Sequence, residues 1–117
     1  MNTRIFGIHA AALEVRSQRM GVLASNIANA ATPGFKARDI DFGTALRARL
    51  DGAASGVGGM AEAGLVYRRP TMQSLDGNTV ELAREQIAFA ENAVAYSATL
   101  SFVQGKVSTI TRALKGE

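Results

Sequence analysis

Few residues of this sequence are candidates for a catalytic or metal-binding site. His9 is the only histidine, it lies in an alanine-rich stretch, and the chain has no cysteine. A metal site or a Ser-His-Asp arrangement would depend on one unassisted imidazole. Asp39 and Asp41 stand two residues apart, but no third ligand follows them at a useful spacing. We therefore predict no catalytic, metal or cofactor site, a surface or packing role for His9, and solvent-facing aspartates paired with Lys36 and Arg38.

Two further segments have only a superficial likeness to ligand-binding motifs. The glycines of residues 56–59 lack the Lys and the Ser or Thr of a phosphate-binding loop, and no strand precedes them. Arg68 and Arg69 beside Tyr67 make a weak platform for nucleic acid, because a single aromatic side chain is present. The net charge of +3 comes from dispersed residues without a Lys/Arg run. This distribution favours a solvated face over a nucleic-acid or lipid surface.

The composition favours closely packed helices. Hydrophobic residues make up 47% of the chain and aromatic residues only 6%, since alanine supplies much of the apolar content. Such a composition suits helices that approach closely. Arg4, Glu14, Arg16 and Arg19 interrupt the N-terminal apolar runs before they could form a signal-peptide core or a membrane span. A protein of this kind that leaves the cytoplasm needs another route.

An apolar pattern with alternating spacings of four and three predicts one helix over residues 4–31. Its repeating positions form the N-terminal seam, which consists of Phe6, Ala10, Leu13, Ser17, Met20, Ala24, Ile27 and Ala31. A second set, Ile8, Val15 and Val22, repeats every seven residues beside this seam. The apolar face is therefore wider than one helix partner would cover.

Thr32, Pro33 and Gly34 predict the end of this helix. The residue before proline is pushed toward extended geometry, and Pro-Gly suits the two central positions of a tight turn. Gly34 can take a positive φ there. Asn26 and Asn29, close to the helix end, can bond backbone groups that the turn leaves free.

The middle of the chain predicts short elements and loops. Ile40 and Phe42 alternate with aspartates, which indicates an extended segment with one buried face. We expect a short helix over residues 44–50. Residues 51–64 hold five glycines and almost no bulky side chains, and are predicted to form a flexible loop. Residues 65–69 have strand character, which the following proline ends.

A second long helix is predicted from Asn78 to the C-terminus. Asp76-Gly77 marks a turn, and Asn78 with Glu81 three residues later matches the capping-box pattern of a helix start. The last turn carries basic residues and Gly116 supplies a terminator. The C-terminal seam of this helix consists of Leu82, Gln86, Phe89, Ala93, Tyr96, Leu100, Val103, Val107, Ile110 and Leu114.

These elements predict a mainly α fold. Two long terminal helices pack as an antiparallel pair or coiled coil, with a short extended segment and the flexible Gly-rich loop between them. The helices would be roughly 40 and 55 Å long at a rise of 1.5 Å per residue. We divide this single domain into residues 1–34, 35–77 and 78–117. A pair packed only on itself would leave apolar residues poorly covered, which usually marks an association surface. The residues concerned are Ile8, Val15, Val22, Ile87 and Val94.

Residues 25–36 have the sequence Ser-Asn-Ile-Ala-Asn-Ala-Ala-Thr-Pro-Gly-Phe-Lys, which closely resembles the signature of the flagellar axial proteins of the rod and hook. Residues 16–20 and 36–42 are similar to the proximal-rod members of that family, and residues 78–116 to their C-terminal helix. Phe35 stands where the family commonly has Tyr, and Ala31 where a polar residue is frequent.

The resemblance implies a structural subunit of the proximal rod of the bacterial flagellar basal body. Such a subunit polymerises through its terminal helices, transmits torque and forms the wall of the export channel. It is exported by the flagellar type III apparatus to the periplasmic rod. Its partners are copies of itself, other rod proteins, the rod adaptor FliE, the membrane ring and the export gate.

Both seams and the signature supply the residues that we expect at subunit interfaces. They are Leu13, Met20, Ile27, Asn26, Asn29, Pro33, Gly34, Phe35, Phe89, Tyr96, Leu100, Val103, Val107, Ile110 and Leu114. The alternative function is a basic helical adaptor or chaperone-like binding module. A nucleic-acid binder would gather its arginines on one face, which this sequence does not do.

Overall fold

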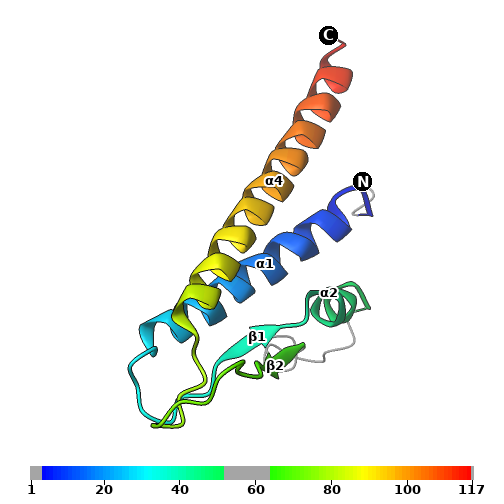
Figure 1. The fold of residues 1–117 in the computed structure, drawn as a ribbon. Coiled ribbons are helices and arrows are strands. Elements are labelled where there is room, and N and C mark those ends of the chain that lie inside the picture. The colour runs from blue at the N-terminus through cyan, green and yellow to red at the C-terminus, as the bar shows by residue number, and fades with distance from the viewer. Residues whose placement is uncertain (1–3, 52–63, 117) are drawn as a thin grey trace.

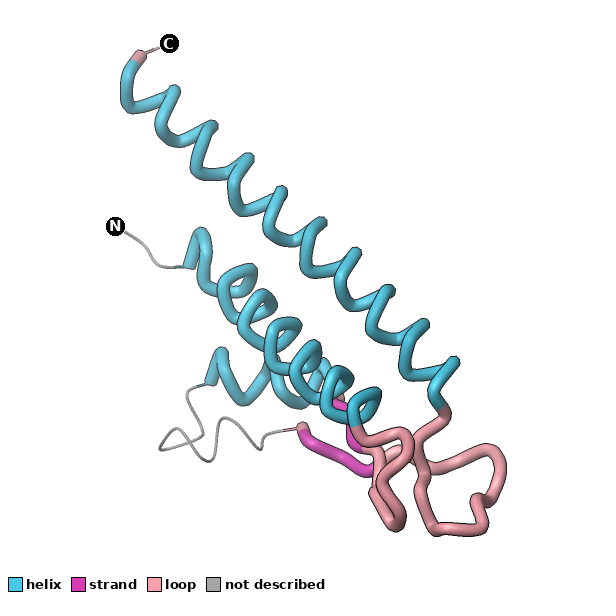
Figure 2. Tube along the Cα trace, turned by 90° about the vertical axis from the view of Figure 1, so that its left-hand side faces the viewer, coloured by secondary structure: helices cyan, strands magenta, loops and turns pink. Residues whose placement is uncertain are grey.

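The computed structural model describes residues 4–51 and 64–116, and of the first three helical residues only the backbone. Its elements in chain order are α1 (Arg4–Ala28), β1 (Arg38–Ile40), α2 (Phe42–Asp51), β2 (Leu65–Tyr67) and α4 (Leu82–Lys115). The two long helices run in opposite directions side by side, and β1, β2 and α2 lie against the other side of α1 (Figures 1 and 2). The predicted mainly helical fold is confirmed. The Gly-rich segment 51–64 lies almost wholly outside the described residues.

The molecule is elongated because α4 is much longer than its partner. It measures 64 × 30 × 18 Å along its principal axes. α4 has 34 residues against 25 in α1, and it extends past the beginning of α1 (Figure 1). None of the described helices has a stretch both long and apolar enough to cross a membrane.

The N-terminal helix ends three residues earlier than predicted, at Ala28. The amide of Ala30 bonds the carbonyl of Ile27 at 3.2 Å, a tighter hydrogen-bond pattern than that of an α-helix. The predicted Pro-Gly turn follows and is confirmed. The amide of Phe35 donates to the carbonyl of Thr32 at 3.2 Å, and Gly34 has φ of +75°.

β1 and β2 form a two-stranded antiparallel sheet in which Arg38 faces Tyr67 and Ile40 faces Leu65. The extended segment predicted from the sequence is therefore confirmed, and so is the predicted strand, although it ends at Tyr67 and not at residue 69. Phe42 is a correction, because it is the first residue of α2 and not part of the strand. The Asp41 side chain accepts the amide of Thr44 at 3.4 Å and thereby caps this helix start.

Gly64 permits the close approach of the sheet to α2. Its φ is +80°, and a Cβ at this position would lie 2.8 Å from the carbonyl oxygen of Asp41. The amide of Asp41 also donates to the carbonyl of Gly64 at 2.7 Å. A side chain at position 64 would therefore have to displace the start of α2.

The apolar core lies between α1, the sheet and α2. Val15, Ile40 and Ala45 form its buried cluster, and Val22, Phe42 and Leu65 pack against it. The guanidinium of Arg16 lies 4.4 Å from the centre of the Phe42 ring. Our expectation that Val15 and Val22 would be poorly covered is wrong, because the sheet and α2 cover that side of α1. Ile8, Ile87 and Val94 are exposed as expected.

The start of α4 differs from the predicted capping box. The helix begins at Leu82, and Glu81 is its N-cap residue without a side-chain capping bond. The Glu81 carboxylate instead accepts the amide and hydroxyl of Thr71. The Asn78 side chain donates to the carbonyls of residues 29, 30 and 32. Asn78 thus satisfies the carbonyls at the end of α1, and not the amides of its own helix.

The end of α4 is formed as predicted. Gly116 adopts the left-handed conformation with φ of +74°, and its amide bonds carbonyls of the last turn. Arg112 and Lys115 lie in that turn, where they complement the helix dipole. The helix therefore stays regular to its last residue.

Candidate assembly interface

The two long helices contact each other through small and polar side chains. Glu85, Ala88 and Asn92 are the buried residues of α4. The Asn92 amide group donates to the carbonyl of Arg16 in α1 at 2.8 Å. Farther along, the rings of His9 and Phe102 lie 4.4 Å apart, which agrees with the predicted packing role of His9. This contact face is rotated away from both predicted seams.

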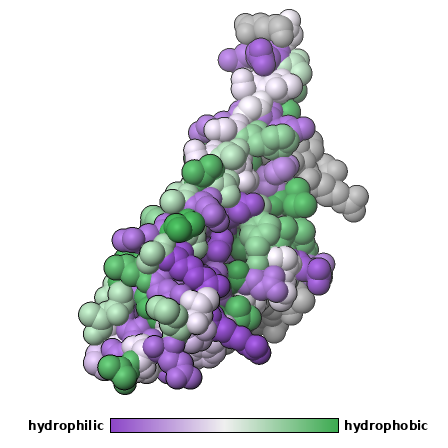
Figure 3. All heavy atoms as spheres, in the orientation of Figure 1, coloured by the Kyte–Doolittle hydropathy of each residue, from purple (hydrophilic) through white to green (hydrophobic). Residues whose placement is uncertain are grey.

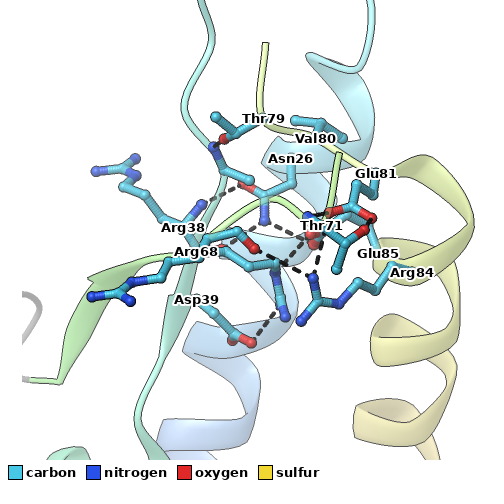
Figure 4. Close-up of polar contacts among 12 residues, drawn as sticks. Asn26, Arg38, Asp39, Arg68, Thr71, Thr79, Val80, Glu81, Arg84 and Glu85 are labelled. Atoms are coloured by element: carbon cyan, nitrogen blue, oxygen red, sulfur yellow. Dashed lines mark hydrogen bonds and ion pairs between the residues drawn. The ribbon is translucent and has the colours of Figure 1, made fainter. Parts of the chain in front are cut away.

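A buried cluster of charged and amide groups joins α1, the sheet and α4 (Figure 4). The Glu85 side chain is 0% exposed. One carboxylate oxygen lies 2.8 Å from Nε of Arg68, as an ion pair without hydrogen-bond alignment. The other accepts Nδ2 of Asn26 at 2.9 Å. Arg68 also pairs with Asp39, which receives two hydrogen bonds from Arg19 at 2.8 and 3.0 Å. The cluster therefore holds the sheet against both helices.

Asn26 is central to this cluster. Besides Glu85, it donates to the carbonyl of Arg38 at 2.6 Å and accepts the amide of Arg38 at 3.1 Å. These two bonds pair the outer edge of β1 as another strand would. Asn29 behaves as predicted, because its side chain donates to the carbonyl of Ser25 at the helix end. Two asparagines of one short segment thus serve different purposes.

The cluster corrects our interpretation of Asp39 and its neighbours. Asp39 is not a solvent-facing partner of Lys36 and Arg38, since its side chain is only 15% exposed and pairs with Arg19 and Arg68. Lys36 donates to the carbonyl of Gly77 at 2.6 Å. Asp41 is exposed as predicted. Arg68, considered above for nucleic acid, is occupied by carboxylates.

We expect acid to weaken the fold through Asp39. Burial raises the pKa of this carboxyl, but hydrogen bonds from Arg19 and the Ile40 amide, with the charges of Arg19 and Arg68, hold the pKa below its ordinary value. A lowered pKa stabilises the fold above the unfolded-state value of about 3.9 and loses that contribution as pH falls through the folded value. Urea unfolding between about pH 7 and 3 should show this loss. An Asp39→Asn chain should be less stable at neutral pH and show a shallower acid dependence; an unchanged dependence would contradict the assignment.

The predicted interface residues fall into three groups. Asn26 is buried. Pro33, Gly34, Leu100, Val107 and Leu114 are exposed, and the remaining ones are half-buried, namely Leu13, Met20, Ile27, Asn29, Phe35, Phe89, Tyr96, Val103 and Ile110. The side chain of Phe6, the first member of the N-terminal seam, lies outside the described residues. Among the described residues of both seams none is fully buried, about half are exposed and the others are half-buried.

Leu13 and Tyr96 come together from different helices. They line an open cleft of 480 Å³ with Ser17 and Arg49. Arg49 pairs there with Glu14 of α1. Members of both seams therefore line one cleft.

Exposed apolar side chains continue along α4. Ile87 is 60% exposed, Val94 70%, Val107 48% and Leu114 84%. Figure 3 shows hydrophobic groups at the surface over the length of the molecule on the face that it presents. A long helix with such a surface is typical of an association site.

Sequence reasoning missed Arg19, Glu85 and Asn92 as structural residues. Charged and amide side chains between seam positions are expected on the polar face of a helix. Burial of these groups is stable only because they pair in space, which offsets the free energy of removing them from water. No spacing along the chain indicates this pairing. Asn78 was predicted to cap the start of the second long helix, but it caps the end of α1.

Comparison with known proteins places these features in context. Residues 6–36 match the family of the flagella basal body rod protein. The flagellar basal body rod protein FlgB of Cereibacter sphaeroides (strain ATCC 17029) is 48% identical over 123 residues, which cover 95% of this chain and 94% of that protein. FlgB of Aeromonas hydrophila is 44% identical over 125 residues, covering 97% and 95%. FlgB of Escherichia coli (strain K12) is 38% identical over 121 residues, covering 89% and 88%.

Proposed function

The chain belongs to the family of the flagellar basal body rod protein FlgB, and from this premise we propose how its surfaces build the rod. It is a structural subunit of the flagellar basal body rod, where it assembles with other rod proteins, and not an enzyme. Membership in this family leaves the basic helical adaptor without support. The finer question is which surfaces of the subunit make the assembly.

We propose that the subunit polymerises through the uncovered seams of α1 and α4. The observation that carries this proposal is the row of exposed apolar residues on α4, which includes Leu100, Val107 and Leu114. Burial of such residues between subunits supplies the driving force of association. The buried charged cluster keeps the two helices and the sheet at a fixed angle, so each subunit offers its neighbours the same surface.

The same assembly accounts for the mechanical and transport roles that we propose. Long helices packed around a common axis transmit torque along the proximal rod and form the wall of the export channel. The subunit reaches its periplasmic position through the flagellar type III apparatus. There it meets the adaptor FliE, the membrane ring and the export gate.

Basal bodies test this proposal directly. A strain that lacks its own copy of the subunit is supplied with a tagged chain, and isolated basal bodies are labelled with gold against the tag. Label at the base of the rod, together with restored swimming, is the expected result. Motile cells whose basal bodies carry no tag would contradict a structural role in the rod.

We predict that Gly34→Val prevents incorporation without unfolding the subunit. Nothing lies within 4 Å of a Cβ at this position, but φ of +75° is strained for a β-branched residue, at a cost of about 1–3 kcal/mol. The turn connects α1 to β1, so relieving the strain changes the angle between them. Basal bodies probed by immunoblot should lack the variant, although cells express and export it. Gly34→Asn should assemble, because Asn tolerates a positive φ; complete rods that contain the valine variant would reduce the turn to a simple helix terminator.

We also expect the purified monomer to be only partly ordered. Residues 104–116 are exposed except Ile110, and a helical segment without tertiary contacts is marginal in water. Amide hydrogens of residues 104–115 should exchange much faster than those of residues 85–99, which pack on α1. Uniform protection of the amide hydrogens along α4 in dilute monomer would contradict the view that this end of the helix is ordered only by a partner.

A further inference from the structure

The last third of α4 is a regular helix with an exposed surface. The ring contact between His9 and Phe102 lies before it, and of residues 104–116 only Ile110 is half-buried. Figures 1 and 2 both show α4 continuing beyond the start of α1. We call residues 103–115 the α4 tip. Its shape is set by the helix, so its surface chemistry can be assigned to faces.

One narrow apolar stripe runs along the α4 tip. At 100° per residue, Val103, Val107, Ile110 and Leu114 fall within about 60° of one another. Val107 is 48% exposed and Leu114 84%. Spacings of four and three in a stripe of this width suit contact with one helix. A helix lying in a lipid surface presents a broader apolar face.

The charged residues of the α4 tip are all basic, and Glu117 is the nearest acidic residue that follows them. Lys106 lies about 40° from one edge of the stripe and Lys115 about 80° from the other, whereas Arg112 lies on the opposite face of the helix. Residues 92–116 contain no Asp or Glu, so these three basic residues give the segment a net charge of +3. Within residues 4–51 and 64–116 none of the three takes part in a salt bridge. The ammonium of Lys106 lies 5.4 Å from the centre of the Phe102 ring.

We propose that the α4 tip binds an amphipathic helix of a different protein that carries Asp or Glu beside its own apolar seam. Two tips packed together would place Lys106 and Lys115 near the same residues of a second copy, and like charges beside a helix seam oppose pairing. An acidic amphipathic helix would cover the apolar stripe with its own seam and pair its carboxylates with the lysines. The inference rests on the assembly role proposed above and adds the chemistry of one neighbour.

Binding of two synthetic helical peptides to the full chain tests the charge. Both peptides carry the same leucine heptads, one with Glu and the other with Lys at all flanking positions, and fluorescence anisotropy measures each affinity. We expect the Glu peptide to bind at least about tenfold more tightly, with a difference that shrinks in high salt. Lys106→Glu combined with Lys115→Glu should reverse the preference. Arg112→Glu is the matched control and should keep it.

Other occupants give distinct results in the same set of measurements. Equal affinity for both peptides, or no binding of either, would overturn the proposal. Disulfide joining of two Val107→Cys chains, with a dimer in sedimentation, would assign the tip to a second copy. Stronger binding to phosphatidylglycerol vesicles than to the Glu peptide would assign it to lipid. Circular dichroism of each variant should show the same helix content as the parent chain.

Incorporation into basal bodies separates this inference from the role on which it rests. The chain that carries both Lys106→Glu and Lys115→Glu should be missing from isolated rods. A Glu→Lys change in the neighbouring protein should restore its incorporation. If the chain with both lysines changed to Glu is incorporated normally while the Val107→Asp chain is not, the acidic partner is refuted and the assembly role stands. Normal incorporation of both variants would refute the assembly role as well.

Discussion

Leu100→Asp and Val107→Asp subunits should be produced and exported but absent from isolated basal bodies, and the cells should not swim. Leu100 is 36% exposed and Val107 48%, so a carboxylate at either position remains hydrated in the free monomer. In the assembly it would be buried in a helix seam without a partner, at a cost of several kcal/mol. A loss of about 3 kcal/mol already lowers an association constant by about a hundredfold.

Thr109→Asp provides the matched control for this prediction. Thr109 is exposed and lies on the opposite side of the helix from Leu100 and Val107. It should assemble normally. Changes within residues 53–59 should also be tolerated. Quantitative immunoblots of purified basal bodies, set against the amount of subunit exported, measure the effect. Motile cells with either aspartate on the seam, and immotile cells with a shortened glycine segment, would reverse our assignment.

Glu85→Ala should destabilise the free subunit by about 3–5 kcal/mol, as expected when one partner of a buried ion pair is removed. The change leaves the Arg68 guanidinium with Asp39 alone and removes the acceptor of one Asn26 hydrogen bond. A small domain has a total unfolding free energy of about 5–15 kcal/mol. The loss would therefore unfold a large fraction of the molecules. Urea unfolding and amide exchange of residues 85–99 are the appropriate measurements.

Two variants isolate the cause of that loss. Glu91→Ala removes an exposed carboxylate from the same helix and should change the unfolding free energy by about 0.5 kcal/mol or less. Glu85→Gln retains an oxygen that can accept from Asn26 but removes the charge next to Arg68. We expect it to fall between the other two. A Glu85→Ala chain as stable as the parent would show that the cluster contributes little to holding the helices together.

Local signals in the sequence were sufficient for the individual elements. The four-three spacing predicted both long helices, because that spacing places apolar side chains on one face whatever the helix packs against. The Pro33-Gly34 turn and the Gly116 terminator were also predicted, since each depends on the backbone freedom of one glycine. Alternation identified the strand at Ile40, although it extended that strand into Phe42, where a new helix already begins.

The antiparallel pairing of the long helices was predicted, but the faces through which the elements pack were decided by tertiary structure alone. Spacing cannot distinguish two adjacent apolar faces of a helix, and the sheet with α2 covers the face of Val15 and not the predicted N-terminal seam. Nor does the sequence reveal that Asn78 caps α1, or that Glu85 meets Asn26 across 59 positions of chain. A buried charge is stable only when its partners arrive from separate elements at the right distance. The sequence by itself determined which helices form and the family to which they belong, whereas the folded chain determined which of their faces are buried within the subunit and which remain exposed.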